Sequence, residues 1–281
     1  MQPKTKNEQN LLTIRLQISK KSSTFAAEKK TNKFMTIHDY NLGFVSNEVI
    51  YNYVKETVVQ YSTFISLKKF NSNIIDPIKL TFDAKVYGRT IEQVVDDECV
   101  RQIDKANSNL LGYFHQNIFK IIGGGWTVPA TGFDVVNENR GIYVEMKSKH
   151  NTMNAAAARD TYLSMLNKVS NDPNATCMLV EVIAKRSQHI NWEGTFKGQT
   201  LKHDRIFRLS IDKFYEVAFN DKYAFMKLCK ALPTILDDVI AETGCGAIEN
   251  TVQQELNQLS VNTFKSLYLL AFQSYQGFDQ L

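Results

Sequence analysis

Cysteine and long apolar runs are scarce in this sequence of 281 residues, and each scarcity excludes a class of protein. The four cysteines never take CxxC spacing, so neither a zinc site nor a disulfide framework is indicated. No run approaches the ~20 apolar residues that a membrane-spanning helix needs, and the apolar stretch near the N-terminus is too short for a signal peptide. With 43% hydrophobic residues the chain is globular, and we expect it in the reducing cytoplasm with no membrane partner.

Outside the first 35 residues, the numbers of basic and acidic side chains are nearly equal. Residues 1–35 carry eight Lys and Arg against two Glu, whereas the whole chain has a net charge of only +4. Residues 1–34 are therefore expected to form a flexible basic arm. Residues 141–213 hold eleven basic against seven acidic side chains. That local excess fits a surface that contacts DNA phosphates, and it fits an ordinary solvated surface equally well.

Three acid-x-Lys triplets compete as the place where catalytic carboxylates gather. Glu28-Lys29-Lys30 lies in the Lys-rich N-terminal tail, which has no strand pattern. Asp83-Ala84-Lys85 lies in an alternating, strand-like stretch over residues 80–87, with Asp76 upstream. However, Asp76 precedes a proline, which favours a turn, and the short gap leaves no room for a partner strand. Only Glu145-Met146-Lys147 has an upstream strand, a turn, an alternating strand and then a helix.

The third triplet belongs to a predicted β-hairpin. Asp134 lies in a short strand-like run, residues 137–141 supply turn chemistry, and residues 142–149 alternate apolar with polar. Because side chains alternate between the faces of a strand, Glu145 and Lys147 share one face, and the hairpin brings Asp134 beside them. Two carboxylates suit Mg²⁺, and a nearby ammonium can position an attacking water. The sequence therefore predicts a metal-dependent phosphodiesterase, and a solvated strand face is the alternative.

Helical patterns surround this hairpin. Four helices are expected to begin at separate N-caps, namely Ser46, Thr90, Ser108 and Asn154. Residues 177–184 are almost continuously apolar, as expected for an inner strand that is covered on both faces. Residues 205–211 form another predicted strand. From residue 212 the pattern is helical to the end, with a break near residue 244.

The order helix, strand, Asp-bearing strand, Glu-x-Lys strand, helix, strand resembles the PD-(D/E)xK nuclease superfamily. Five segments (YFHQNIFK, GFDVV, VEMKSKHNTMN, LVEVIAK and RLSIDKFYEV) resemble one family of type II restriction endonucleases, nearest to enzymes that cut the palindrome GGNCC. The likeness covers roughly positions 40–235, and its one departure is Phe133 in place of the superfamily's proline. The resemblance implies an α/β (α+β) fold, with a mixed central sheet flanked by helices and helical additions at both ends.

The resemblance also assigns roles to residues. Catalysis falls on Asp134, Glu145 and Lys147, and Mg²⁺ would be held by the two carboxylates and the Met146 backbone carbonyl. Cleavage would leave a 5′-phosphate and a 3′-hydroxyl. Gln116 falls where superfamily members often place an acidic metal helper, although a solvent-exposed glutamine fits the pattern equally well. A palindromic target implies a homodimer that cuts double-stranded DNA, with a companion methyltransferase acting outside the complex.

Polar residues that follow the two inner strands are the candidate DNA contacts. They are Lys149, His150, Asn151, Asn154, Lys185, Arg186 and Gln188. Helix capping by Asn154 and a solvated loop around Lys185 are the alternatives. His150 has no carboxylate partner in view, so a polar contact is expected rather than a general base.

Four regions are expected. They are the arm over residues 1–34, a helical accessory and dimerisation region over 35–107, the catalytic core over 108–213 and a helical C-terminal region over 214–281. Two other functions remain open: a repair or junction-cutting nuclease of the same fold, and a DNA-binding protein that no longer cuts. The intact set of two acids and one lysine favours cutting.

Overall fold

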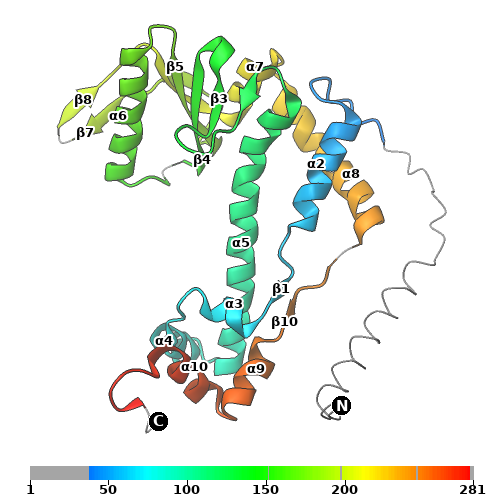
Figure 1. Cartoon of the computed structure of the whole chain (residues 1–281), viewed down its shortest axis with the longest axis vertical. Coiled ribbons are helices and arrows are strands. Elements are labelled where there is room, and N and C mark those ends of the chain that lie inside the picture. Colours follow the sequence, from blue (N-terminus) through cyan, green and yellow to red (C-terminus); the bar gives the residue numbers. More distant parts are fainter. Residues whose placement is uncertain (1–37, 151, 197, 245, 279–281) are drawn as a thin grey trace, which may run out of the picture. The chain divides into compact units, whose positions relative to one another are not determined.

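The computed structural model describes residues 38–150, 152–196, 198–244 and 246–278 (Figure 1). The predicted basic arm and the candidate DNA contact Asn151 lie outside these residues. In the described part, each helix is too short or too polar to cross a lipid bilayer.

A six-stranded mixed sheet forms the centre of the fold. Its strands follow the order β2 (Trp126–Thr127), β3 (Val135–Asn137), β4 (Ile142–Lys149), β5 (Thr176–Ile183), β9 (Ile206–Ser210) and β6 (His189–Asn191). β4, β5 and β9 are parallel, whereas β2, β3 and β6 are antiparallel to their neighbours. The predicted hairpin and inner strand are thereby confirmed. A separate antiparallel pair, β7 (Gly194–Phe196) with β8 (Gln199–Leu201), lies where no strand is predicted.

Helices cover both faces of this sheet. α6 (Ala155–Asn171), capped by Asn154 as predicted, packs its buried side chains against β5 and β9 on one face. On the other face lie α5 (Ile91–Ile122) and α7 (Ile211–Phe219), where the rings of Phe119 and Phe214 approach to 4.7 Å. α8 (Ala224–Thr243) packs on α7 and on α2 (Asn47–Val59). The predicted α/β class, with a mixed sheet flanked by helices, is confirmed.

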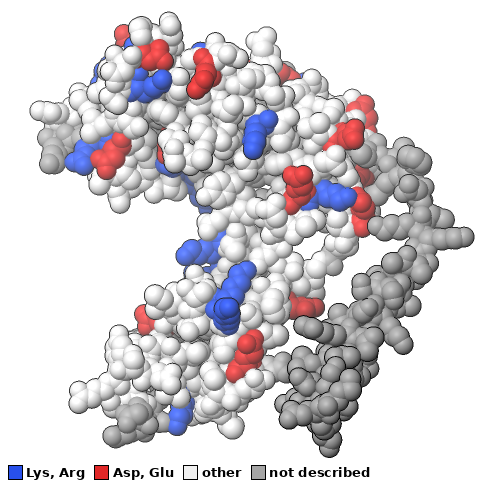
Figure 2. Space-filling view, in the orientation of Figure 1, with Lys and Arg blue, Asp and Glu red and all other residues white. Residues whose placement is uncertain are grey.

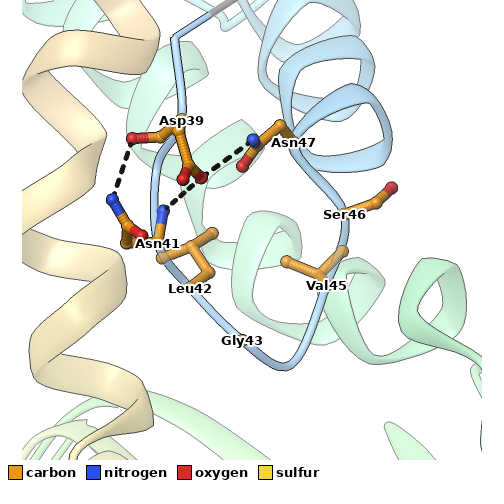
Figure 3. Close-up of a pocket in the computed structure, with 7 residues that line it drawn as sticks. All are labelled: Asp39, Asn41, Leu42, Gly43, Val45, Ser46 and Asn47. Carbon is orange, nitrogen blue, oxygen red and sulfur yellow. Dashed lines mark hydrogen bonds between the residues drawn. The ribbon is translucent and has the colours of Figure 1, made fainter.

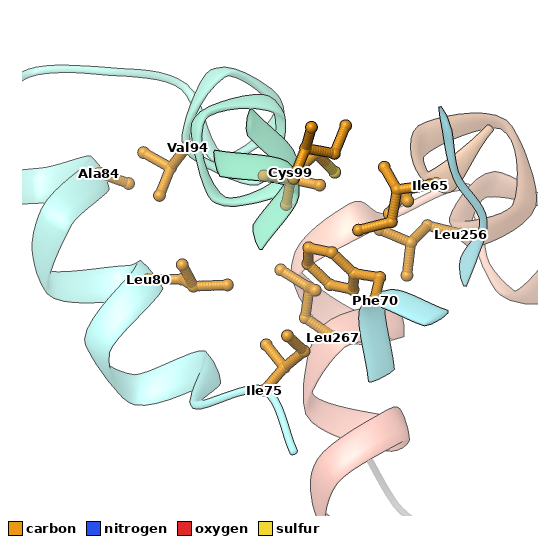
Figure 4. Packing of buried hydrophobic residues seen from close by; sticks show 12 residues of the cluster. Ile65, Phe70, Ile75, Leu80, Ala84, Val94, Cys99, Leu256 and Leu267 are labelled. Carbon is orange, nitrogen blue, oxygen red and sulfur yellow. The ribbon is translucent and has the colours of Figure 1, made fainter. Parts of the chain in front are cut away.

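A second hydrophobic core, which we call the helical lobe, forms around the first half of α5 (Figure 4). It comprises α3 (Leu67–Asn71), α4 (Pro77–Val86), α9 (Val252–Leu259), α10 (Thr263–Phe272) and the parallel pair β1 (Phe64–Ile65) with β10 (Glu249–Asn250). Phe70, Leu80 and Leu256 point into this core. Helices that precede and follow the sheet in sequence therefore share one core, which closes around α5.

One strand-like pattern and one predicted helix boundary are wrong. Residues 80–87 alternate like a strand but belong mostly to α4, and Asp76 caps that helix by accepting hydrogen bonds from Ile78 N and Lys79 N at 3.0 Å. α5 is a single helix of 32 residues that continues through Ser108, where a separate N-cap was expected. The sequence has no glycine or proline between residues 91 and 111 to end it. α5 also crosses the expected boundary at residues 107 and 108, and the division into four regions stays a prediction.

The other caps form as predicted. Thr90 makes a complete capping box with Gln93 at the start of α5. In the loop before α2, Asp39 Oδ1 accepts hydrogen bonds from Asn41 N at 3.1 Å and from Asn47 Nδ2 at 3.0 Å (Figure 3). Ser46 then caps α2 by accepting from the backbone of Val49. Short-range hydrogen bonds thus fix both helix starts.

Gly141, which closes the turn between β3 and β4, has a backbone that a side chain would disturb. Its φ is 63°, and an added Cβ would overlap the carbonyl oxygen of Asn174. Gly88 has a similar φ of 62° but open space around its Cβ position. We expect Gly88→Ala to lower the free energy of unfolding by about 1 kcal/mol through backbone strain, and Gly141→Ala by about 3 kcal/mol. Urea unfolding measures both free energies. Equal losses for the two variants would contradict the close approach of Gly141 to the Asn174 carbonyl.

Candidate active site

The hairpin brings the three predicted catalytic side chains together. Asp134 immediately precedes β3, which pairs antiparallel with β4. Its Oδ2 accepts a hydrogen bond of 2.7 Å from the backbone N–H of Met146, the residue between the other two. Lys147 Nζ donates to Glu145 Oε1 at 2.6 Å. The burial of β4 also alternates as predicted, with Met146 buried and its two neighbours half-buried on the opposite face.

Glu145 occupies an environment that disfavours its own charge. Burial, together with the nearby Asp134 carboxylate, raises its pKa above the ordinary value of 4.5, while the hydrogen bond from Lys147 partly offsets that rise. A divalent cation would relieve this repulsion, so the donor chemistry fits one. The described residues contain no cluster of three or more His, Cys, Asp and Glu side chains. Mg²⁺ would therefore take the two carboxylates and the Met146 carbonyl, and it keeps several waters in such sites.

The site opens into a pocket of about 430 Å³ between the sheet and α5. Its walls hold Asp134, Lys147 and, from α5, Gln116, so the candidate helper lines the same pocket as Asp134, whereas Glu145 is not among the lining residues. Gly112 of α5 faces β4, since a Cβ there would lie in ordinary van der Waals contact with Ser148 Oγ, at 3.8 Å. The unbroken course of α5 is what places Gln116 here. Its role as a helper stays a prediction.

A buried ionic cluster adjoins the catalytic strand, and the sequence identified it only in part. Glu181, 1% exposed, is the register partner of Lys147 on the neighbouring parallel strand, so both side chains lie on the same face of the sheet. Its carboxylate pairs with Arg208 and lies 3.0 Å from His150 Nδ1. Arg208 also contacts His150 Nδ1 at 2.9 Å.

This cluster corrects the interpretation of His150, which does have a carboxylate partner. Arg208 was missed, although a carboxylate inside an apolar strand is itself a signal that a buried cation must lie nearby. The cluster joins three neighbouring strands beside the site, because Glu181 lies on β5, Arg208 lies on β9 and His150 directly follows β4. It fixes the segment that follows β4, where His150 N also donates to the Ile183 carbonyl at 2.9 Å.

The remaining candidate DNA contacts are spread over two segments. Lys149 is exposed at the end of β4, and Lys185 and Arg186 are exposed in the loop after β5. The backbone of Gln188 is bonded to Ser210. Asn154 accepts a hydrogen bond of 2.8 Å from Ala157 N, which is the alternative role considered for it. DNA contact by any of them stays a prediction.

Comparison with known proteins decides the family. Residues 42–241 match the model of the Eco47II restriction endonuclease family. The chain belongs to this family. It is 27% identical over 222 residues to the type II restriction enzyme Sau96I of Staphylococcus aureus, a stretch that covers 75% of this chain and 82% of the relative. It is also 27% identical over 213 residues to the type II restriction enzyme Eco47II of Escherichia coli, covering 72% and 89%.

Both relatives of this Eco47II-family chain are named type II restriction enzymes, which are site-specific deoxyribonucleases. The predicted resemblance to type II restriction endonucleases is therefore confirmed. The family match also contains every residue of the site and of the cluster around Glu181. The candidate active site therefore lies within the part of the chain that matches the family.

The raised pKa of Glu145 gives a prediction for stability. A carboxyl whose pKa is higher in the folded protein binds its proton more tightly when folded, so stability falls as the pH rises from the unfolded to the folded pKa. Glu145→Gln removes that penalty. With a chelator present, we expect the variant to unfold at higher urea concentration than wild type at pH 7.5, and the gap to narrow as the pH falls towards 4.5. A variant less stable than wild type at pH 7.5 would refute the burial argument.

Proposed function

We propose that this chain is a PD-(D/E)xK restriction endonuclease, which uses Mg²⁺ to hydrolyse both strands of a short palindromic DNA site. One observation carries the proposal: Asp134 lies hydrogen-bonded to the strand segment that presents Glu145 and Lys147. Asp134 and Lys147 line the pocket, and Glu145 is ion-paired to Lys147. Two acids and one ammonium are the groups that metal-assisted phosphodiester hydrolysis requires. Cleavage leaves a 5′-phosphate and a 3′-hydroxyl, as the superfamily implies.

Each side chain has a distinct task in this mechanism. Asp134 and Glu145 would each give a carboxylate oxygen to the metal, and the Met146 carbonyl would complete the protein ligands. When bound, Mg²⁺ lowers the pKa of a coordinated water and neutralises charge that builds on the phosphate. Lys147 has three N–H donors, of which one is spent on Glu145. The other two can orient the water and stabilise the developing negative charge on the phosphoryl oxygens.

The recognition sequence and the partners follow from the resemblance. GGNCC is the proposed target, and a palindrome requires a two-fold symmetric homodimer in which each subunit cuts one strand. DNA is held by Lys149, His150, Lys185 and Arg186 around the site, largely through phosphates. A companion methyltransferase protects the host DNA in the same cytoplasm.

Digestion of unmodified phage DNA with the full chain and Mg²⁺ tests this proposal. Discrete fragments, with ends that all map to one short palindrome, are the expected result. Smeared products or preferential cutting of branched DNA would favour a repair nuclease instead. A shift of the DNA in a gel without any cutting would favour a binding protein that no longer cuts.

A further inference from the structure

The outer face of α4 in the helical lobe is apolar and exposed. This helix buries Pro77, Leu80 and Ala84 in the core of the lobe. Its other side carries three apolar residues at a spacing of four. One more apolar residue lies just before the helix, and another lies just after it. These residues and their exposed fractions are Ile74 (86%), Ile78 (51%), Phe82 (65%), Val86 (71%) and Tyr87 (70%). A repeat of four places Ile78, Phe82 and Val86 on one face of the helix, where they form a stripe. Ile74, just before α4, and Tyr87, directly after it, adjoin the two ends of this stripe.

The stripe is too large for an ordinary monomer surface. Side chains of this size present roughly 150 to 250 Å² each when fully exposed, so the five exposed fractions amount to roughly 700 Å². The largest apolar patch on a typical monomer covers roughly 300 to 600 Å². α10 extends it further, because the Tyr268 hydroxyl lies 3.0 Å from the Thr81 hydroxyl of α4 and the Phe264 ring packs at a tilt against Tyr268. Figure 2 shows Lys, Arg, Asp and Glu scattered over the viewed face of the molecule.

We propose that this α4 stripe is the surface through which two copies of the chain associate. The inference rests on the proposed function, since cutting both strands of a palindrome needs two subunits. A standard protein–protein interface buries about 800 Å² on each partner, and the stripe with the adjoining part of α10 supplies about that area. DNA is disfavoured as the occupant, because phosphate binding relies on several Lys and Arg. The five residues of the stripe are uncharged, Lys79 beside them is paired with Asp83, and the exposed Lys85 adds a single charge.

The stripe can also match a copy of itself, as a two-fold interface requires. Two antiparallel α4 helices that cross near Leu80 place Ile78 of one against Phe82 of the other. Lys79 and Asp83, on the edge of the stripe, form an ion pair within the same helix. Their charges are therefore already balanced when the two copies meet.

Phe82→Glu, with Val59→Glu as its matched control, tests the inference. Val59 is 69% exposed on α2, so it offers an equally exposed apolar side chain elsewhere on the chain. Sedimentation gives the dimer dissociation constant of the full-length wild type and of both variants. We expect Phe82→Glu to weaken the dimer by at least about 100-fold and Val59→Glu to leave it unchanged. Thermal unfolding confirms that both variants fold, as their exposed positions imply.

Cleavage of a supercoiled plasmid gives the second readout. A wild-type dimer converts it directly to linear DNA, whereas dissociated Phe82→Glu should accumulate the nicked circle at least about 10-fold more. A dimer that survives Phe82→Glu, or one that Val59→Glu dissociates, overturns the inference. A wild type that is monomeric both free and on DNA overturns it too. A wild-type dimer that cuts no DNA would instead overturn the proposed function and leave the association surface to be judged by sedimentation alone.

Discussion

Asp134→Ala is expected to lower the single-turnover rate of DNA cleavage by at least about 10³-fold, because the proposed metal site would lose one of its two carboxylate ligands. Among the residues that the structure describes, Asp134 accepts a single hydrogen bond, from the backbone N–H of Met146, so the fold should survive its loss. Binding to DNA should remain, and it should tighten if repulsion between the carboxylate and a phosphate falls. Gel-shift titration without metal measures the binding, and a quench-flow assay with Mg²⁺ measures the rate.

Asp83→Ala is the matched control for that variant. Asp83 belongs to the competing acid-x-Lys triplet, but it lies on α4 and pairs with Lys79 one turn earlier in the helix. Its loss should cost no more than about 0.5 kcal/mol of stability. At protein concentrations that keep the chain dimeric, it should leave the cleavage rate unchanged. If Asp83→Ala stopped cleavage and Asp134→Ala did not, the assignment of the active site would be wrong.

Glu181→Ala should cause the largest loss of stability, about 4 kcal/mol. The substitution leaves Arg208 without its carboxylate partner in a largely buried position, and an unpaired buried charge is far more costly than a missing surface pair. Urea unfolding of the metal-free protein measures the change. Replacing both residues by leucine should recover most of the loss, since two apolar side chains need no partner.

An exposed ion pair provides the comparison for this effect. Glu193 pairs with Lys202, and both side chains are at least half exposed to solvent. We expect Glu193→Ala to change the free energy of unfolding by less than about 1 kcal/mol. A similar cost for Glu181→Ala would mean that the cluster is solvated rather than buried.

Local patterns predicted the hairpin well, because its determinants lie within 16 residues of sequence. Turn residues before Gly141 and strict alternation in β4 fix the register, and the register places Asp134 beside Glu145 and Lys147. The same kind of pattern failed over residues 80–87, which alternate by chance. There, Asp76 before Pro77 was the better signal, since it is an N-cap followed by a favoured first helical residue.

Contacts between distant segments were beyond local patterns. Arg208 meets His150 across 58 residues of sequence, and only the pairing of β5 with β9 brings them together. Likewise, Gln116 reaches the pocket because α5 continues past Ser108 and presents Gly112 to β4. Which side of α4 is exposed depends on which side packs into the helical lobe. The sequence of that helix alone does not determine this.

Titration of Mn²⁺ followed by electron paramagnetic resonance tests most directly whether Asp134 and Glu145 share one divalent ion. Wild type should take up the ion with an affinity that Asp134→Asn and Glu145→Gln each reduce by at least about 10-fold, while Asp83→Asn leaves it unchanged. Equal affinity in wild type and in both active-site variants would contradict a metal centre between these two carboxylates.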